Sequence, residues 1–112
     1  MLTNSSSFLD TAQAYRNEAE AGIAIRESGL ARHEIFITTK YSGLDGLDIP
    51  TSIINSLKNV SICHLLTVIL TLCKLGVSYV DLYLIHHPRL AVPDIPTAWR
   101  EMEEIKAKGL AK

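Results

Sequence analysis

The sequence has few cysteines, no excess of one charge and no apolar run long enough to cross a membrane. Its two cysteines, Cys63 and Cys73, form no metal-binding pattern, so a reducing compartment is the default expectation. Eleven basic against twelve acidic side chains leave a formal charge of −1, which offers no electrostatic footprint for nucleic acid. The longest apolar run, residues 65–73, is shorter than the ~20 residues that a membrane-spanning helix needs. We therefore expect a cytoplasmic protein that binds neither nucleic acid nor a membrane.

What the chain does contain is an ordinary globular composition, with 47% hydrophobic and 21% charged residues. Its 112 residues allow one domain with a modest core. Residues 1–7 are polar and carry no basic group, which indicates a disordered lead-in rather than a signal peptide.

Three stretches have the pattern of β-strands, and a helical stretch follows each of them. Residues 8–10 match the end of a strand, residues 35–39 a strand buried on both faces, and residues 77–85 a longer strand. This alternation predicts a parallel α/β sheet with right-handed crossovers. A helix is expected over residues 17–28, with an apolar face formed by Ala19, Gly22 and Ile23. A second is expected from about 48–50 onward, with Ile53, Ile54 and Leu57 on its apolar face. A third is expected over 96–108, with Trp99, Met102 and Ile105 on its apolar face.

An ionisable residue closes each predicted strand: Asp10, Lys40 and His86. In a barrel of parallel strands, chemistry collects at the C-terminal edge of the sheet, so these three side chains are expected to meet there. Side chains alternate along a strand, so Lys40 should share its face with Thr38, and His86 should share its face with Leu84.

With Tyr15, which follows Asp10 after one tight turn, these residues suit the reduction of a carbonyl group. That reaction requires a hydride source and a proton donor. A tyrosine is a weak acid, with an unperturbed pKa near ~10, but a neighbouring ammonium favours its phenolate. A carboxylate can hold the ammonium in place, and a histidine can orient the carbonyl oxygen. Tyr15, Lys40, Asp10 and His86 supply this set.

Taken one at a time, each of these residues has a simpler interpretation. An aspartate after a strand commonly caps a helix, a tyrosine at a helix start commonly packs, and a lysine in a loop is commonly solvated. His86 and His87 could form half of a metal site, but no third ligand with suitable spacing appears, so no metal is expected.

Three motifs in order resemble the aldo-keto reductase family. DTAQAYRNE at residues 10–18 is similar to its D-T-A-x-x-Y-x-N-E signature, IFITTK at 35–40 to its lysine strand, and DLYLIHHP at 81–88 to its D-L-Y-L-I-H-x-P strand. The resemblance implies a (β/α)8 TIM barrel and NADPH-dependent reduction of an aldehyde or ketone to an alcohol. It makes Tyr15 the proton donor, Lys40 the group that strengthens this acid, Asp10 its partner, and His86 the residue that binds and positions the substrate.

The resemblance covers only about three βα units, corresponding to strands 2 to 4 of the family barrel. A complete barrel requires about 250 residues, and most of the family's NADPH-binding positions lie on later strands, so no cofactor-binding residue is assigned here. We therefore expect residues 1–112 to be a fragment of an NADP-dependent oxidoreductase domain that is inactive by itself on its small carbonyl substrate. The alternatives are a non-catalytic binding module of the same family, a mis-spliced product without function, and an unrelated α/β domain with coincidental motifs.

Residues 60–74 interrupt the family pattern. Deleting them joins Asn59 to Leu75 and places Ile53, Leu57 and Leu75 at the i, i+4 and i+7 positions of one helix. Our hypothesis is a translated in-frame intron, because Val60-Ser61 can be encoded by GTA-AGT, a splice-donor sequence, and Lys74 by AAG, which ends in an acceptor AG. The alternative is a helical extension, and the genomic sequence decides between the two.

Overall fold

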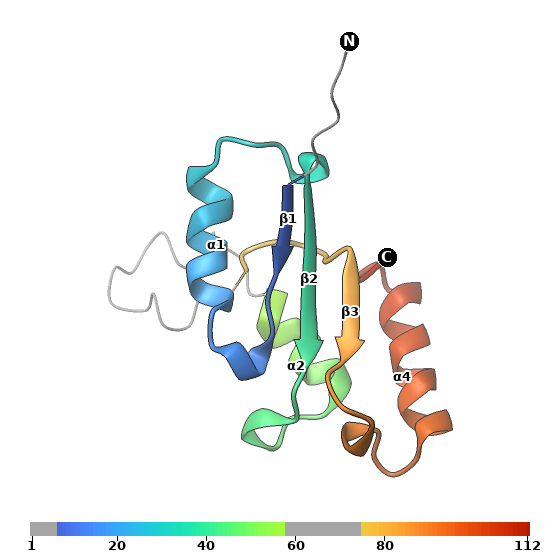
Figure 1. Cartoon of the computed structure of the whole chain (residues 1–112). Helices are drawn as coiled ribbons and strands as arrows, with labels where there is room; N and C mark the ends of the chain where they lie inside the picture. The colour runs from blue at the N-terminus through green and yellow to red at the C-terminus, as the bar shows by residue number, and fades with distance from the viewer. Residues whose placement is uncertain (1–6, 58–74) are drawn as a thin grey trace.

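The computed structural model describes residues 7–57 and 75–112, and this part of the chain contains one three-stranded parallel sheet with helices beside it (Figure 1). The strands lie in the order β1-β2-β3, which is their order in the sequence. The predicted alternation of strands and helices is therefore confirmed. The elements are β1 (Ser7–Asp10), α1 (Glu18–Glu27), β2 (Ile35–Tyr41), α2 (Ile49–Leu57), β3 (Leu82–Ile85) and α4 (Ile95–Ala107).

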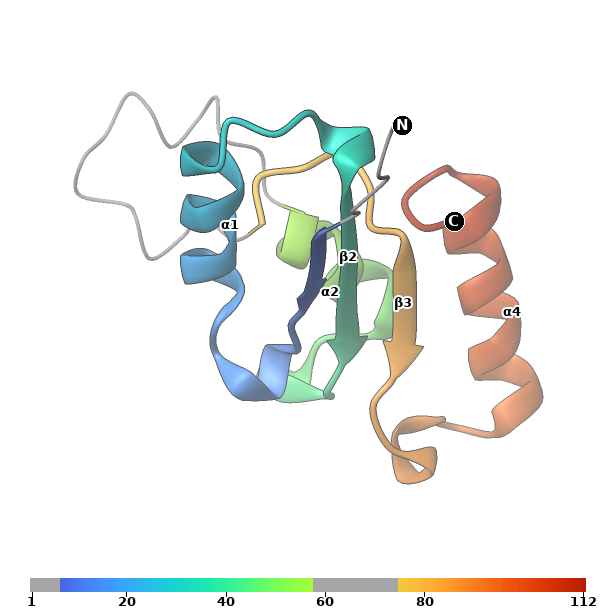
Figure 2. The same cartoon turned by 45° about the horizontal axis from the view of Figure 1, so that its top comes forward.

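The helices cover one face of the sheet, and the other face is open. Along β2, Ile35, Ile37 and Thr39 are buried, whereas Phe36 between them is 36% exposed. The prediction that residues 35–39 are buried on both faces is thus wrong. Helix α2 lies behind the centre of the sheet (Figures 1 and 2), and no described residue covers the opposite side.

We call this uncovered side the open face. It carries four large apolar side chains that are all more than one third exposed: Phe8, Phe36, Leu82 and Leu84. The register pairs Thr38 with Leu82 and Lys40 with Leu84, so the predicted sharing of one face by Thr38 and Lys40 is confirmed. His86 follows the last paired residue, so its predicted sharing of a face with Leu84 stays a prediction.

The core lies between β2 and the helices α2 and α4. Its fully buried aliphatic side chains are Ile37, Ile53, Leu75, Val80 and Ile105. Helix α4 packs on α2 through Ala98 and Ile105, which are seven residues apart and therefore share one side of the helix.

All three predicted helix faces need correction. In α2, Ile53 and Leu57 are buried as predicted, but Ile54 is 60% exposed. Trp99 was expected in the core, but it is 59% exposed and lines a cavity of about 500 Å³ along the open edge of β3, together with Leu84 and Ile85. In α1 the buried residues include Ala21 and Gly22 with Glu18, while Ile23 is 36% exposed. These errors arise because each helix buries only the stripe that contacts the neighbouring element.

The third strand is shorter than predicted, with regular pairing only from Leu82 to Ile85. Before it, Asp81 accepts a hydrogen bond from the Ile37 amide through its side chain, at 2.9 Å, in place of a backbone carbonyl. Val80 forms a parallel bridge with Ala111 on the other side. The chain after α4 therefore runs parallel to β3 at its free edge.

The end of α2 bears on the predicted insertion. The Leu75 amide donates to the Ser56 carbonyl at 3.0 Å, and Gly76 follows with a left-handed φ of 67°. In a helix without residues 60–74, Leu75 would stand four residues after Ser56 and make this same bond, and Gly76 would be a suitable terminating residue. The lead-in was predicted over residues 1–7, but Ser7 already belongs to β1. Residues 1–6 and 60–74 lie outside the described residues, so the lead-in there and the insertion remain predictions.

Among the described helices, none has the length and apolar character that a membrane crossing requires.

Candidate active site

The four predicted site residues gather at the C-terminal edge of the sheet. Asp10 ends β1, Lys40 is the penultimate residue of β2, and His86 directly follows β3. Tyr15 ends a short 3-10 helix, Gln13–Tyr15, that begins two residues after β1. Because the strands are parallel and adjacent, their C-terminal ends meet at one corner of the molecule.

Lys40 is the centre of this group. Its Nζ donates to Asp10 Oδ1 at 2.5 Å, to the Thr11 carbonyl at 3.3 Å and to Tyr15 Oη at 3.4 Å. Only 12% of the Lys40 side chain is exposed, whereas 70% of the Asp10 side chain is. The ammonium is thus confined between three oxygen atoms, while its carboxylate partner is open to solvent.

The charge state of Lys40 follows from two opposing effects. Burial lowers the pKa of its ammonium, but the hydrogen bonds to Asp10 and Tyr15, and the charges of these groups, raise it by more. The net result is a pKa above the ordinary 10.5 of lysine. Lys40 is therefore a fixed positive charge beside the Tyr15 hydroxyl throughout the neutral range.

His86 and Tyr15 face each other across the site. Their ring centroids are 5.4 Å apart with the planes at 87°, an edge-on arrangement. His86 Nδ1 lies 3.2 Å from Ser42 Oγ, and its backbone amide donates to the Tyr41 carbonyl at 2.9 Å. All four predicted residues are thus brought together, while His87 is turned to cap the following helix, where its Nδ1 accepts from the Arg89 amide at 3.1 Å.

Sequence reasoning missed the residues that hold this group in place. Glu18, in the first turn of α1, is buried, with 3% of it exposed, and accepts from Thr39 Oγ1 at 2.6 Å. Thr11 Oγ1 donates to the Thr38 carbonyl at 2.8 Å. Ser42 has no signal in the sequence at all, because its contact with His86 spans 44 residues.

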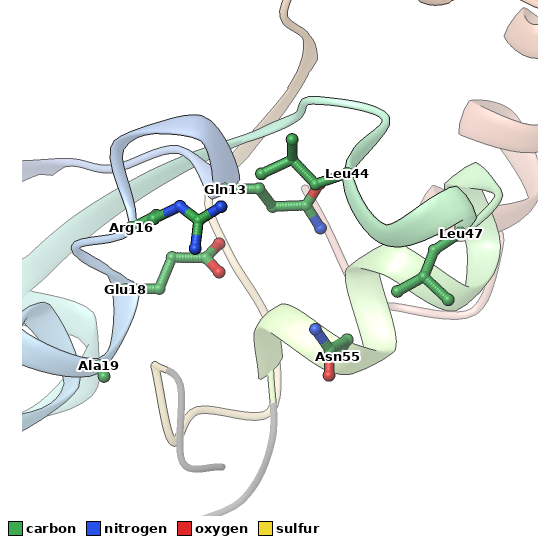
Figure 3. Close-up of a pocket in the computed structure, with 7 residues that line it drawn as sticks. All are labelled: Gln13, Arg16, Glu18, Ala19, Leu44, Leu47 and Asn55. Atoms are coloured by element: carbon green, nitrogen blue, oxygen red, sulfur yellow. The ribbon is translucent and has the colours of Figure 1, made fainter. Parts of the chain in front are cut away.

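A small cavity lies behind the site, between the 3-10 helix Gln13–Tyr15, α1 and α2 (Figure 3). Its volume is about 140 Å³, below the ~300–1,000 Å³ of typical ligand pockets, so it is too small for a dinucleotide. In Figure 3, Arg16 and Glu18 point toward one side of the cavity and Leu44, Leu47 and Asn55 lie on the other. Gln13 lies between these two sides, next to Leu44.

The described residues provide no complete cofactor site. The larger cavity, along β3, is mainly apolar, with Lys106 and Lys112 at its rim, and lies along the sheet edge rather than at the corner that holds Tyr15. Among residues 7–57 and 75–112, no three His, Cys, Asp or Glu side chains gather closely enough to bind a metal ion. What these residues do provide is a proton-bearing tyrosine, a cation and an imidazole on an accessible surface.

A parallel α/β sheet with a Tyr–Lys–Asp–His cluster at its C-terminal edge has the architecture of a (β/α)8 barrel enzyme. The model of the Aldo/keto reductase family matches residues 1–112, and the chain belongs to this family.

Known relatives agree with this membership. Methylglyoxal reductase DkgA from Escherichia coli (strain K12) is 36% identical over 104 residues, which are 93% of this chain and 32% of that protein. Aldo-keto reductase Rv2971 from Mycobacterium tuberculosis is 38% identical over the same shares. The chain therefore spans about a third of the length of these relatives.

Solved structures of the family have the same fold in the matching region. An aldo/keto reductase from Brucella melitensis superposes with a TM-score of 0.60 and 34% identity, covering 96% of this chain and 36% of that one. A Bombyx mori aldo-keto reductase in complex with NADP has a TM-score of 0.61 and 30% identity, covering 93% and 33%. The three-stranded sheet is thus part of a (β/α)8 barrel architecture, and NADP is a cofactor of the family.

Proposed function

We propose that this chain carries the proton-donating corner of an NADPH-dependent aldo-keto reductase, which reduces an aldehyde or ketone to an alcohol. The observation that supports this most directly is the position of Lys40 Nζ, which donates to both Tyr15 Oη and Asp10 Oδ1. A lone tyrosine would be too weak an acid at neutral pH. A tyrosine beside a fixed ammonium leaves a stabilised phenolate when it gives up its proton.

In this proposal each residue has one task. NADPH, when bound by the complete barrel, supplies the hydride to the carbonyl carbon. Tyr15 Oη gives its proton to the carbonyl oxygen, and the Lys40 ammonium stabilises the phenolate that remains. Asp10 holds Lys40 in place, and the His86 imidazole donates a hydrogen bond that orients the carbonyl oxygen.

The substrate is a small carbonyl compound, and methylglyoxal is the first one to test because the relative DkgA is named for it. A cytoplasmic location belongs to the same proposal.

We propose further that residues 1–112 form part of a single oxidoreductase domain and are inactive alone. The expected result is no NADPH binding when the full chain is titrated and nicotinamide fluorescence is followed. Clear micromolar binding would refute this part of the proposal and would favour the alternative, a binding module of the same family.

The catalytic roles can be tested in a chimera, in which the matching 104 residues of DkgA are replaced by those of this chain without residues 60–74. We expect methylglyoxal-dependent oxidation of NADPH, and a loss of about 10²–10⁴-fold in kcat with Tyr15→Phe. Tyr79→Phe, which removes a hydroxyl at the opposite edge of the sheet, is the matched control. A Tyr15→Phe chimera with unchanged kcat would remove Tyr15 from the reaction.

A further inference from the structure

The contact between Ser42 and His86 joins the ends of two neighbouring strands. Ser42 follows β2 and His86 follows β3, and the His86 amide donates to the Tyr41 carbonyl at 2.9 Å, which brings the two segments together. Ser42 Oγ then lies 3.2 Å from His86 Nδ1. A neutral imidazole carries one proton on either nitrogen, so this contact selects which nitrogen bears it.

The surroundings of Ser42 indicate the direction of that hydrogen bond. A serine hydroxyl has one proton and two lone pairs, and the Ala14 amide already donates to one lone pair at 3.1 Å. The proton of Ser42 can go to His86 Nδ1 at 3.2 Å or to the Lys40 carbonyl at 3.4 Å. The latter distance is long for a bond between two oxygens, which prefer 2.5–3.0 Å, so the imidazole nitrogen is the better acceptor.

Ser42 is also held in position from its backbone side. Its amide donates to Gln13 Oε1 at 3.0 Å, and Gln13 Nε2 reaches the Ser52 carbonyl at 3.3 Å and Ser56 Oγ at 3.4 Å in α2. The turn that carries Tyr15 therefore makes two hydrogen bonds to Ser42, one through the Gln13 side chain and one through the Ala14 amide. The hydroxyl is oriented before any substrate arrives.

We propose that Ser42 is a positioning residue that keeps the proton of neutral His86 on Nε2. Ser42 donates to Nδ1, which is left without a proton, and Nε2–H becomes the donor available to a carbonyl oxygen. The use of this donor in carbonyl reduction rests on the proposed function, whereas the tautomer itself is a property of the chain alone.

The test is histidine NMR on the full chain labelled with ¹⁵N in its imidazoles, recorded at a pH where they are neutral. The His86 signals are assigned by their disappearance in His86→Gln. We expect Nδ1 of His86 to resonate as an unprotonated nitrogen and Nε2 as a protonated one. In Ser42→Ala both resonances should shift toward the average of two exchanging tautomers, as in a free imidazole. A protonated Nδ1 in the unaltered chain overturns the proposal, as does an unchanged spectrum in Ser42→Ala.

Two further variants separate this role from general structure. Ser42→Thr keeps the hydroxyl and should keep the Nε2–H tautomer, while Ser78→Ala, at an exposed serine before β3, should leave His86 unaffected. In the chimera, Ser42→Ala should raise KM for methylglyoxal more than it lowers kcat. An inactive chimera with the expected tautomer would contradict the proposed function and leave the role of Ser42 standing.

Discussion

At the scale of single residues, the site depends on one buried cation with several acceptors. Lys40 is anchored by Asp10 and the Thr11 carbonyl, so its ammonium is already ordered for the proton transfer that we propose from Tyr15. Electrostatic groups placed in advance cost no reorganisation at the moment of reaction. The residue that matters most after Tyr15 should therefore be Lys40.

Replacing Lys40 with methionine in the chimera should lower kcat by at least about 100-fold at neutral pH, because the phenolate of Tyr15 loses its counter-charge. Methionine keeps the length of the side chain, so the packing should change little. Lys106→Met, in the last turn of α4, is the matched control and should keep the activity. Equal losses in both variants would show that the effect is not specific to the site.

Lys40 also predicts how stability depends on alkaline pH. Its pKa is raised in the folded chain, so its favourable contribution is complete below its unfolded value and disappears as the pH rises through the folded value. The free energy of unfolding of the full chain, measured with urea, should therefore decrease above about pH 10.4. In Lys40→Met this part of the decline should be absent, and an identical decline in both proteins would contradict it.

At the scale of elements, the opposite edge of the sheet is held by a second charged group. The Asp81 carboxylate accepts from the Ile37 amide at 2.9 Å and from Arg32 Nη2 at 2.8 Å, and Lys112 Nζ lies 3.8 Å away. Arg32 also donates to the Tyr79 carbonyl at 2.9 Å and stacks on its ring. These contacts join β2 to the segment before β3, where regular strand pairing has not yet begun.

Asp81→Asn should destabilise the chain at neutral pH by about 1–3 kcal/mol, because it weakens hydrogen bonds to a charged and largely buried group. Burial raises the pKa of the Asp81 carboxyl, but the Ile37 amide, Arg32 and Lys112 lower it by more. Its contribution is therefore present above the unfolded pKa near 3.9 and lost as the pH falls through the lower folded value. Urea unfolding measured between pH 7 and 3 should show that the free energy of unfolding decreases less toward acid pH in the variant than in the unaltered chain. A parallel decline would contradict this role.

The junction at the end of α2 yields a prediction about residues 60–74. Their deletion should raise Tm by several degrees. Leu75 is fully buried and already makes the hydrogen bond of a helical residue, so the deletion should leave its contacts in place. The shorter connection costs less closure entropy, which should stabilise the chain by about 1 kcal/mol or less. Differential scanning calorimetry measures this. A Gly/Ser segment of equal length in place of 60–74 is the control that separates length from composition. A lower Tm on deletion would favour a structural helical extension.

At the scale of the whole molecule, the open face is the surface that should promote self-association. Phe8 and Phe36 pack against each other with ring centroids 5.5 Å apart, yet Phe8 remains 76% exposed. Leu82 and Leu84 extend the same apolar surface. Exposed apolar patches and free strand edges promote association.

The full chain should therefore self-associate in a concentration-dependent manner when followed by sedimentation velocity. Phe36→Lys should reduce this association, because it places a charge in the middle of the open face. Ile54→Lys, at a residue that is 60% exposed on α2, is the matched control and should have little effect. Equal reductions in both variants would show that net charge rather than the open face controls association.

The sequence by itself determined the order of the elements and which four residues would lie together where the strands end. Strand and helix periods, and motifs such as DTAQAYRNE, are local, so Asp10, Tyr15, Lys40 and His86 could be named without coordinates. The parallel arrangement followed from the alternation of elements, and with it the shared edge where the strands end.

Only the tertiary structure decided which faces are buried and what holds the site residues. Local pattern cannot tell a strand covered on two faces from one covered on a single face, which is why Phe36 was placed in the core. It also cannot show which stripe of a helix contacts the neighbouring element, which is why Trp99 was placed there too. The contacts of Ser42 with His86 and of Glu18 with Thr39 join residues 44 and 21 positions apart. Such pairs leave no trace in either local segment, because they form only when neighbouring elements pack.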